Sequence, residues 1–491
     1  MTDAVKPAGM AVAPESAFGS LRALTPWIAA VAAFLVLPYV FTSGAALTML
    51  SLMGIMIVFT LSYNMLLGQT GMLSFGHAVY YGLGAFFTVH VMNFVIRNGL
   101  PVPVPVIPIV GGLFGLVFGI LFGWVSTKRG GTAFAMISLG LAELVASSAN
   151  ILRGFFGGEE GITTNRTKLL GVFGYNFGPQ IQVYFLIAAW CVLCMILMYA
   201  ITRTPLGRMC NAVRENAERA QFVGYNPQMV RFLAFCLASF FAGVAGSLAA
   251  INFEIVNATY VGVGQSGVVL LAAYVGGIGF FFGPIIGAVI VTYLQVMLSD
   301  VTEIWQLYFG LMFIVIVMFA PNGVAGVIMM HRPLWRAGVV QRVMPAYLVA
   351  LGPALLFTGA AILLIEMIHH AAAKAGEGPK MTFLRVPLDL SSPVSWLAAV
   401  GLLAVSFFLS RLVWPMIARA WGDAMGTARE RGFVSLRRPP SSSSTSRNAS
   451  AGPRSSAASA STCKRAGATP SSAPTGPASR PCSTSSPGAF R

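Results

Sequence analysis

The feature that most constrains this chain is a succession of apolar stretches that are each long enough to cross a membrane. A helix rises about 1.5 Å per residue, so about 20 apolar residues cross the roughly 30 Å hydrocarbon core of a bilayer. Spans are predicted near residues 24–42, 45–67, 74–96, 104–125, 131–152, 181–202, 228–251, 265–281, 283–300, 305–320, 343–368 and 394–414. The sequence therefore predicts an all-α integral membrane protein, a polytopic helical bundle with about ten core transmembrane helices and about two extra C-terminal ones.

The composition agrees with lipid as the surrounding solvent. Of the 491 residues, 56% are hydrophobic and only 9% are charged, whereas soluble domains carry about 25% charged residues. Half of the net charge of +16 comes from residues 437–491, which hold eight basic groups and no acidic one. The sequence shows no basic face with interleaved aromatic residues, so the predicted partner is a lipid bilayer and not nucleic acid.

Shifts in composition divide the chain into four predicted regions. Residues 1–23 are predicted to form a cytoplasmic N-terminal segment, 24–330 the transmembrane core, and 331–436 an extension with two spans. Residues 437–491 have almost no large apolar residue and cannot build a core. Two interpretations of this tail stay open: a disordered basic tail, or the frameshifted product of a GC-rich gene.

Basic residues in the short loops predict the orientation of the chain. With the N-terminus in the cytoplasm, the inner loops carry ten Lys and Arg residues and the outer loops carry seven. Cytoplasmic loops of membrane proteins hold such an excess. The sequence therefore favours both termini on the cytoplasmic side.

Two glycine-rich stretches begin alike. Residues 68–87 read GQTGMLSFGHAVYYGLGAFF, and residues 264–283 read GQSGVVLLAAYVGGIGFFFG. In the predicted topology they enter the membrane from opposite faces, which favours an inverted repeat that lines a transport path. The alternative is that the glycines only let helices pack closely. The candidate residues for path or packing are Gly68, Gln69, Gly71, Ser74, Gly76, His77, Gly264, Gln265 and Gly267.

Two ionisable residues lie within predicted spans. Glu143 sits mid-span, where a carboxylate costs roughly 3 kcal/mol on insertion scales, so it is expected to face a bundle interior or water. It is a candidate path or gating residue, or a partner in a helix–helix hydrogen bond. His77 is either a satisfied structural group or a ligand, and a lone histidine is more often the former.

The inner segment 203–231 predicts one short amphipathic helix, LGRMCNAVRENAERAQFVG, between two spans. Its apolar stripe recurs at three- and four-residue steps and comprises Leu206, Met209, Val213, Ala217 and Ala220. Gly224 and the pair Asn226-Pro227 end it. The stripe predicts a partner protein, and the alternative is a helix that rests on lipid headgroups.

Several chemistries have no residues to support them. The chain has no GxxxxGK[ST] loop to cradle nucleotide phosphates, no GxSxG elbow and no zinc motif. The six cysteines and five histidines show no metal-ligand spacing. No catalytic residue, metal or cofactor is therefore predicted, and the energy for active transport must come from elsewhere. A self-contained ion-coupled carrier stays open as the alternative.

Five motifs together resemble the M-type permeases of the branched-chain amino-acid ABC transporter family. They are YNMLLGQTGMLSFGHAVYYGLGAF, GGEEGI, TPLGRMCNAVRENAERAQFVGYNPQMVRFLAFCLASFFAGVAGSL, YVGGIGFFFGPIIGA and FAPNGVAGV, in order over residues 45–330. The resemblance implies a non-enzymatic permease subunit in the bacterial inner membrane that imports branched-chain or other neutral amino acids. Related permeases carry urea or short amides, so that substrate class stays open.

The resemblance also implies partners and a coupling site. The implied partners are a second, H-type permease, two cytoplasmic ATPase subunits and a periplasmic amino-acid-binding protein. By position, residues 203–227 correspond to the family's coupling loop, and the matching residues are Arg214, Glu215, Asn216 and Gly224. The extension after residue 330 departs from the usual family pattern.

Overall fold

The protein is described by a computed structural model that covers residues 17–158, 160–171, 174–373, 378, 380–383 and 386–431. The predicted tail 437–491 and residues 1–16 of the N-terminal segment lie outside the described residues. Helices appear at all twelve predicted spans: α1 (Ala17–Val40), α2 (Gly44–Asn64), α3 (Ala78–Asn98), α4 (Ile107–Ser126), α5 (Thr132–Ile151), α7 (Gln180–Arg203), α10 (Pro227–Phe253), α11 (Val263–Gly276), α12 (Gly283–Ser299), α13 (Trp305–Phe319), α15 (Val340–Ala373) and α16 (Pro393–Glu430).

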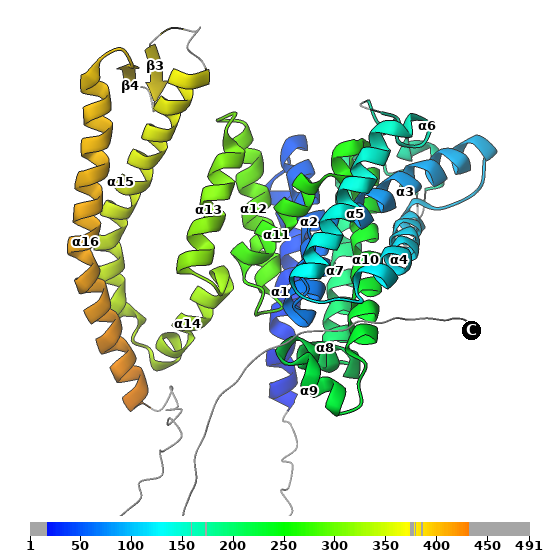
Figure 1. Cartoon of the computed structure of the whole chain (residues 1–491), viewed down its shortest axis with the longest axis horizontal. Coiled ribbons are helices and arrows are strands. Elements are labelled where there is room, and N and C mark those ends of the chain that lie inside the picture. Colours follow the sequence, from blue (N-terminus) through cyan, green and yellow to red (C-terminus); the bar gives the residue numbers. More distant parts are fainter. Residues whose placement is uncertain are drawn as a thin grey trace, which may run out of the picture. The chain divides into compact units, whose positions relative to one another are not determined.

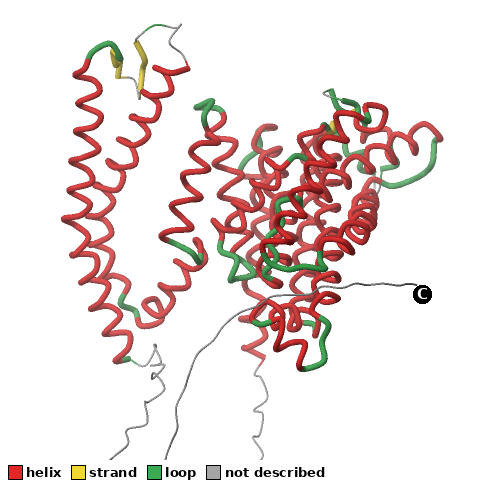
Figure 2. Tube along the Cα trace, in the orientation of Figure 1, coloured by secondary structure: helices red, strands yellow, loops and turns green. Residues whose placement is uncertain are grey.

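The remaining elements are short and lie between the spans. They are α6 (Arg153–Phe156), α8 (Pro205–Glu215), α9 (Ala217–Phe222), α14 (Gly323–Ala337), the strand pairs β1 (Ile162–Thr163) with β2 (Ile255–Val256) and β3 (Lys380–Phe383) with β4 (Val386–Asp389), and the turns η1 (Met65–Thr70), η2 (Val104–Val106), η3 (Arg166–Lys168) and η4 (Ala258–Val261). Figure 2 shows helices over most of the trace. The fold is the predicted all-helical, multi-pass type, with nine helices in the described part long and apolar enough to cross a membrane.

The core of the bundle forms around α10, α3 and α2, which are the most completely buried of the long apolar helices. Helix α10 packs against α4 and α3 through glycines that bring the backbones together. A Cβ added at Gly84 would lie 2.6 Å from the Gly243 Cα, and one added at Gly115 would lie 3.0 Å from the same atom. Close backbone approach at small residues drives helix association where lipid removes the hydrophobic difference. The glycines of α3, α4 and α10 therefore determine this packing.

The membrane helices are interrupted at two places. Helix α2 ends in the π-helical turn η1, and residues 71–77 then run without helical structure to α3, which begins at Ala78. The predicted start near residue 74 was therefore too early. After α10, residues 254–262 similarly precede α11, which has only 14 residues. At about 1.5 Å per residue, α11 is too short to cross a bilayer alone.

The loop between α5 and α7 is fixed to the end of α10 by a buried arginine. Arg166 donates from Nη1 to the carbonyl oxygens of Ile251 and Asn252, at 3.0 and 2.9 Å. Its backbone N–H also donates to the Glu254 carboxylate at 2.8 Å. The last carbonyls of a helix have no partner within the helix, and a basic side chain can satisfy them. This contact and the β1–β2 pair hold the loop against α10.

The extension after the core is a hairpin of α15 and α16, which lie side by side in Figure 1 and pack on α14. The predicted boundary at residue 330 falls inside α14. At one end of the hairpin, Leu334 and Val343 form an apolar cluster with Ala424 and Ala428. Further along α15, the Glu366 carboxylate accepts hydrogen bonds from the hydroxyls of Thr302 and Tyr308, both at 2.9 Å. The extension is thus tied to α13 as well as to α14.

We expect Glu366→Ala to weaken the attachment of the extension to α13. The substitution leaves the Thr302 and Tyr308 hydroxyls without their acceptor, and a hydrogen bond to a charged group contributes about 1.5–3 kcal/mol. The measurement is the thermal unfolding midpoint of the purified protein in detergent. Glu430→Ala, at an exposed position near the end of α16, is the matched control. Equal midpoints for the two variants would contradict the expectation.

Candidate functional site

The end of α2 is joined to the loop between α7 and α10 by one arginine. Arg214 of α8 donates from Nη1 to the carbonyl oxygen of Gly68 in η1, although the two residues are 146 positions apart. A Cβ added at Gly71 would lie 3.1 Å from the Arg214 side chain, and Gly71 itself has a left-handed φ of 70°. A non-glycine residue is rare in that conformation. Gly68 therefore accepts the hydrogen bond of Arg214, and Gly71 packs against its side chain.

The first predicted stretch is tightly packed, and its members are buried except Gln69, Gly71, Leu73, Phe75 and Phe87. A Cβ at Gly68 would lie 2.8 Å from the Ile278 carbonyl oxygen, and one at Gly76 would overlap the Ser138 carbonyl oxygen. The glycines here permit backbone contact with α5 and with the chain after α11. For Gly68 and Gly76, the packing interpretation accounts for the residue type.

Polar side chains of the same stretch are enclosed by aromatic rings. His77 is fully buried, stacks on Phe59 with centroids 5.5 Å apart, and its Nε2 lies 2.9 Å from the Ser62 Oγ. The Tyr63 hydroxyl donates to the Ser74 carbonyl oxygen at 3.1 Å. The Ser74 hydroxyl and His77 Nδ1 are buried without a hydrogen-bond partner in the described chain. His77 thus makes its hydrogen bond within the bundle, as expected of a structural group and not of a ligand.

The second predicted stretch meets the first at the start of α3. The Ser266 hydroxyl accepts a hydrogen bond from the Ala78 backbone N–H at 3.0 Å. Both stretches lie beside an interruption, since residues 71–77 separate η1 from α3 and residues 254–262 precede α11. The two stretches differ in register, however, because residues 68–71 end a helix and 264–267 begin one. The inverted repeat therefore stays a prediction, and the GQ[TS]G letters do not mark equivalent positions.

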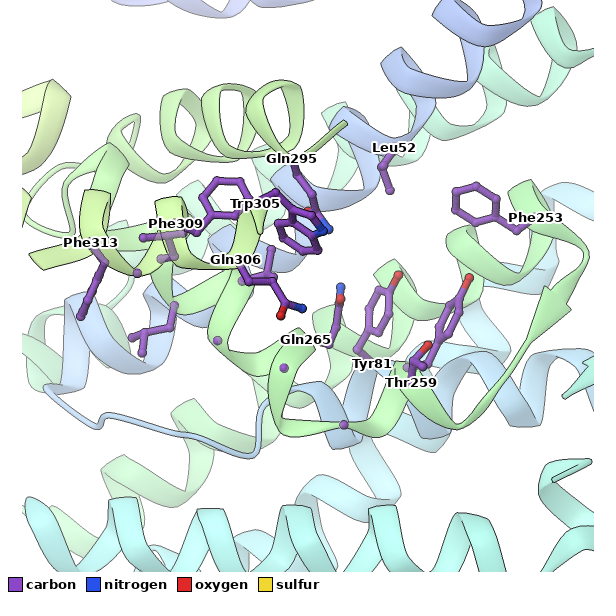
Figure 3. Close-up of a pocket in the computed structure, with 18 residues that line it drawn as sticks. Leu52, Tyr81, Phe253, Thr259, Gln265, Gln295, Trp305, Gln306, Phe309 and Phe313 are labelled. Carbon is purple, nitrogen blue, oxygen red and sulfur yellow. The ribbon is translucent and has the colours of Figure 1, made fainter. Parts of the chain in front are cut away.

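Gly264, Gln265 and Gly267 line a cavity of about 970 Å³ between α2, α3, α11, α12 and α13 (Figure 3). A Cβ added at Gly264 or Gly267 would meet no atom within 4 Å. The close-packing interpretation therefore fails for these two glycines, which open onto space instead. Sequence reasoning missed the other polar residues of the cavity wall, which are Tyr81, Thr259, Tyr260, Gln295 and Gln306. The three glutamines within apolar stretches were a signal that could have found them.

Glu143 lies on an exposed face of α5 and not in the interior of this chain's bundle. Of the two expected surroundings, a bundle interior or water, the first is therefore not provided by the described part of this chain. Leu144 and Met136 on the same helix are 58% and 65% exposed. A carboxylate at membrane depth is costly against lipid, and the described part of the chain does not cover this face of α5.

The predicted amphipathic segment is two helices, because Asn216 breaks it with φ −158° and ψ 102°. The Asn216 Oδ1 then accepts from the Arg219 backbone N–H at 2.8 Å and caps α9, while Gly224 ends the segment at φ 94°. The apolar stripe packs on Val230 and Ala234 of α10, so its partner is this chain. Burial in that cluster raises the pKa of the Cys210 thiol to about 11. Exposed apolar surface lies instead at Phe222 and Val223, which are 84% and 72% exposed.

The fold and the site define a class of protein, a multi-pass helical membrane protein with interrupted helices. A short soluble helix pair is joined by a hydrogen bond to one of the interrupted helices. Such interruptions are characteristic of transporters. Residues 45–320 match the family of permease components of branched-chain amino acid transport systems, and the chain belongs to this family. It is a transporter subunit and not an enzyme, as the sequence predicted.

The chain is similar to several characterised members of this family. It is 26% identical over 290 residues to the high-affinity branched-chain amino acid transport system permease protein LivM of Escherichia coli, covering 55% of this chain and 67% of that protein. It is 23% identical over 283 residues to BraD of Pseudomonas aeruginosa, covering 54% and 90% of the two chains. It is 22% identical over 280 residues to LivH of Escherichia coli, covering 54% and 89%. No solved structure matches the chain.

Proposed function

We propose that this chain is a transmembrane permease subunit of an ATP-driven importer for branched-chain or other neutral amino acids, with residues 24–330 as its transport core. The names of the relatives support the substrate class. The single observation that carries the mechanism is the bond between Arg214 of α8 and the Gly68 carbonyl of η1. It connects a soluble helix directly to the interrupted part of a membrane helix.

In this proposal the importer has two cytoplasmic ATPase subunits, and each permease contacts one of them. Residues 203–227 are the loop of this chain that its ATPase moves. Phe222 and Val223 are the exposed apolar tip that docks on the ATPase. Arg214, near the end of α8 and in the middle of the segment, passes the movement to η1. Asn216 and Gly224 fix the geometry of α9 between these two contacts, and Glu215 is an exposed neighbour of the arginine.

The remaining partners follow from the exposed faces of the chain. We propose that a second, H-type permease covers the α5 face that bears Glu143. Figure 1 shows the start of α1 and the end of α16 at the same end of the molecule as α8 and α9. That end is cytoplasmic if α8 and α9 meet the ATPases, in agreement with the loop charges. A periplasmic amino-acid-binding protein delivers solute at the opposite end, and the membrane is the bacterial inner membrane.

The test is uptake by the assembled transporter in proteoliposomes. The chain is reconstituted with its proposed partners, the second permease, the ATPases and the binding protein, and radiolabelled L-leucine is supplied with the binding protein. We expect uptake that requires ATP and is competed by L-isoleucine and not by urea. Uptake driven by an ion gradient with this chain alone would instead identify a self-contained carrier and refute the proposal.

A further inference from the structure

The cavity beside α11 contains polar groups that the chain leaves without partners. The Gln265 Nε2 has only the sulfur of Met56, at 4.0 Å, and the carboxamides of Gln295 and Gln306 have no hydrogen-bond partner in the described parts of the chain. Tyr81 is 3% exposed and lines the cavity, but its hydroxyl also lacks such a partner there. An unpaired polar group costs several kcal/mol in hydrocarbon, by a general estimate of about 2–7 kcal/mol. These groups therefore face water or a polar solute.

The cavity lies in the half of the molecule away from α8 and α9. Its wall includes Phe253, where α10 ends after starting beside α9, and Trp305, where α13 starts before running to α14. Figure 3 shows the carboxamides of Gln265 and Gln306 turned toward one another across the space. No lining residue carries a charge. The cavity thus opens on the side where the proposed function has solute arrive.

We propose that this cavity is a transit site for one zwitterionic α-amino acid with an uncharged side chain, held within this subunit and apart from the interface with the second permease. The inference rests on the proposed function and adds a location and a specificity to it. A volume of about 970 Å³ is within the general range of about 300–1,000 Å³ for small-molecule sites.

Different groups of the cavity wall match the carboxylate, the ammonium and the side chain of such a solute. The first turn of α11, uncapped by any side chain at Gly262, presents backbone N–H groups that bind a carboxylate. The Gln265 and Gln306 oxygens accept from the ammonium, which also lies against the stacked rings of Tyr81 and Tyr260, whose centroids are 5.7 Å apart. Leu52, Leu271 and Phe309 receive the aliphatic side chain.

The same wall disfavours amino acids with a charged side chain. Lysine or glutamate would bring an additional charge to a site with no opposite charge, and burying an unpaired charge is far more costly than burying a methyl group. The transit site therefore selects for uncharged side chains within this subunit, in addition to any selection by the proposed binding protein.

The test is a substitution that adds a large side chain at a glycine of the cavity wall. Gly267→Phe adds a ring at the cavity wall, and Gly352→Phe on the exposed face of α15 is the matched control, since a Cβ at either glycine meets nothing within 4 Å. In proteoliposomes containing the complete transporter, we expect Gly267→Phe to lower ATP-driven L-leucine uptake more than tenfold. Stimulation of ATP hydrolysis by the binding protein, and the amount of assembled complex, remain as in the control.

A second variant changes the polar wall without filling it. Gln306→Leu keeps the size of the side chain and removes the carboxamide, and we expect it to raise the KM for L-leucine about tenfold with little change in the maximal rate. Wild-type uptake in both Gly267→Phe and Gln306→Leu would overturn the transit site and leave the proposed function standing. A lack of ATP-driven uptake by the wild-type complex would instead refute the proposed function itself.

Discussion

Gly246→Val is expected to remove most of the folded protein from the membrane. A Cβ at Gly246 overlaps the carbonyl oxygen of Tyr81 and lies 3.2 Å from the backbone nitrogen of Ala85, so the substituent meets the backbone of α3 and not the end of a flexible side chain. Overpacking typically costs about 1–3 kcal/mol and more where nothing can move aside. Because native stabilities are only about 5–15 kcal/mol, we expect folded protein to fall about tenfold.

The measurement is the amount of monodisperse protein recovered from membranes, compared with total expressed chain. Gly352→Val is the control, since it adds the same side chain to a membrane helix at a glycine with open space around it. A normal yield of Gly246→Val would show that α3 and α10 can separate at this point without loss of the fold.

Arg214→Ala is expected to uncouple ATP hydrolysis from transport. The substitution removes the donor to the Gly68 carbonyl and leaves α8 without its bond to η1. A hydrogen bond from a charged donor contributes about 1.5–3 kcal/mol, and each 1.4 kcal/mol corresponds to a tenfold change. We therefore expect ATP-driven uptake to fall roughly 10- to 100-fold, while the ATPases continue to hydrolyse ATP.

Two companion variants separate coupling from folding. Arg208→Ala removes a nearby exposed arginine on α8 and should leave uptake unchanged. Arg214→Lys keeps the charge and one donor but lacks the planar guanidinium, so it should restore part of the uptake. If Arg214→Ala transports as well as Arg208→Ala, the bond to Gly68 has no part in coupling.

Sequence reasoning was most successful where the signal is local. The spans, the helix break at residues 224–227 and the family motifs all depend on neighbouring residues, and the structure places helices at each predicted span. It failed where one sequence pattern has two physical outcomes. Gly68 and Gly264 begin nearly identical motifs, yet Gly68 meets other backbone atoms and Gly264 opens onto a cavity. The apolar stripe of 206–220 predicted an external partner, and α10 fills that role.

By itself the sequence determined the class of protein, because the length of an apolar run is sufficient to predict a membrane helix. It also predicted that the energy for active transport comes from elsewhere, because the sequence has no GxxxxGK[ST] motif for a nucleotide. Only the tertiary structure decided which residues meet. The bond from Arg214 to Gly68 joins positions 146 apart, and that from Ala78 to Ser266 joins positions 188 apart. Such pairs depend on how whole helices pack, and no local pattern encodes them. The site of this transporter subunit is therefore defined by its packing.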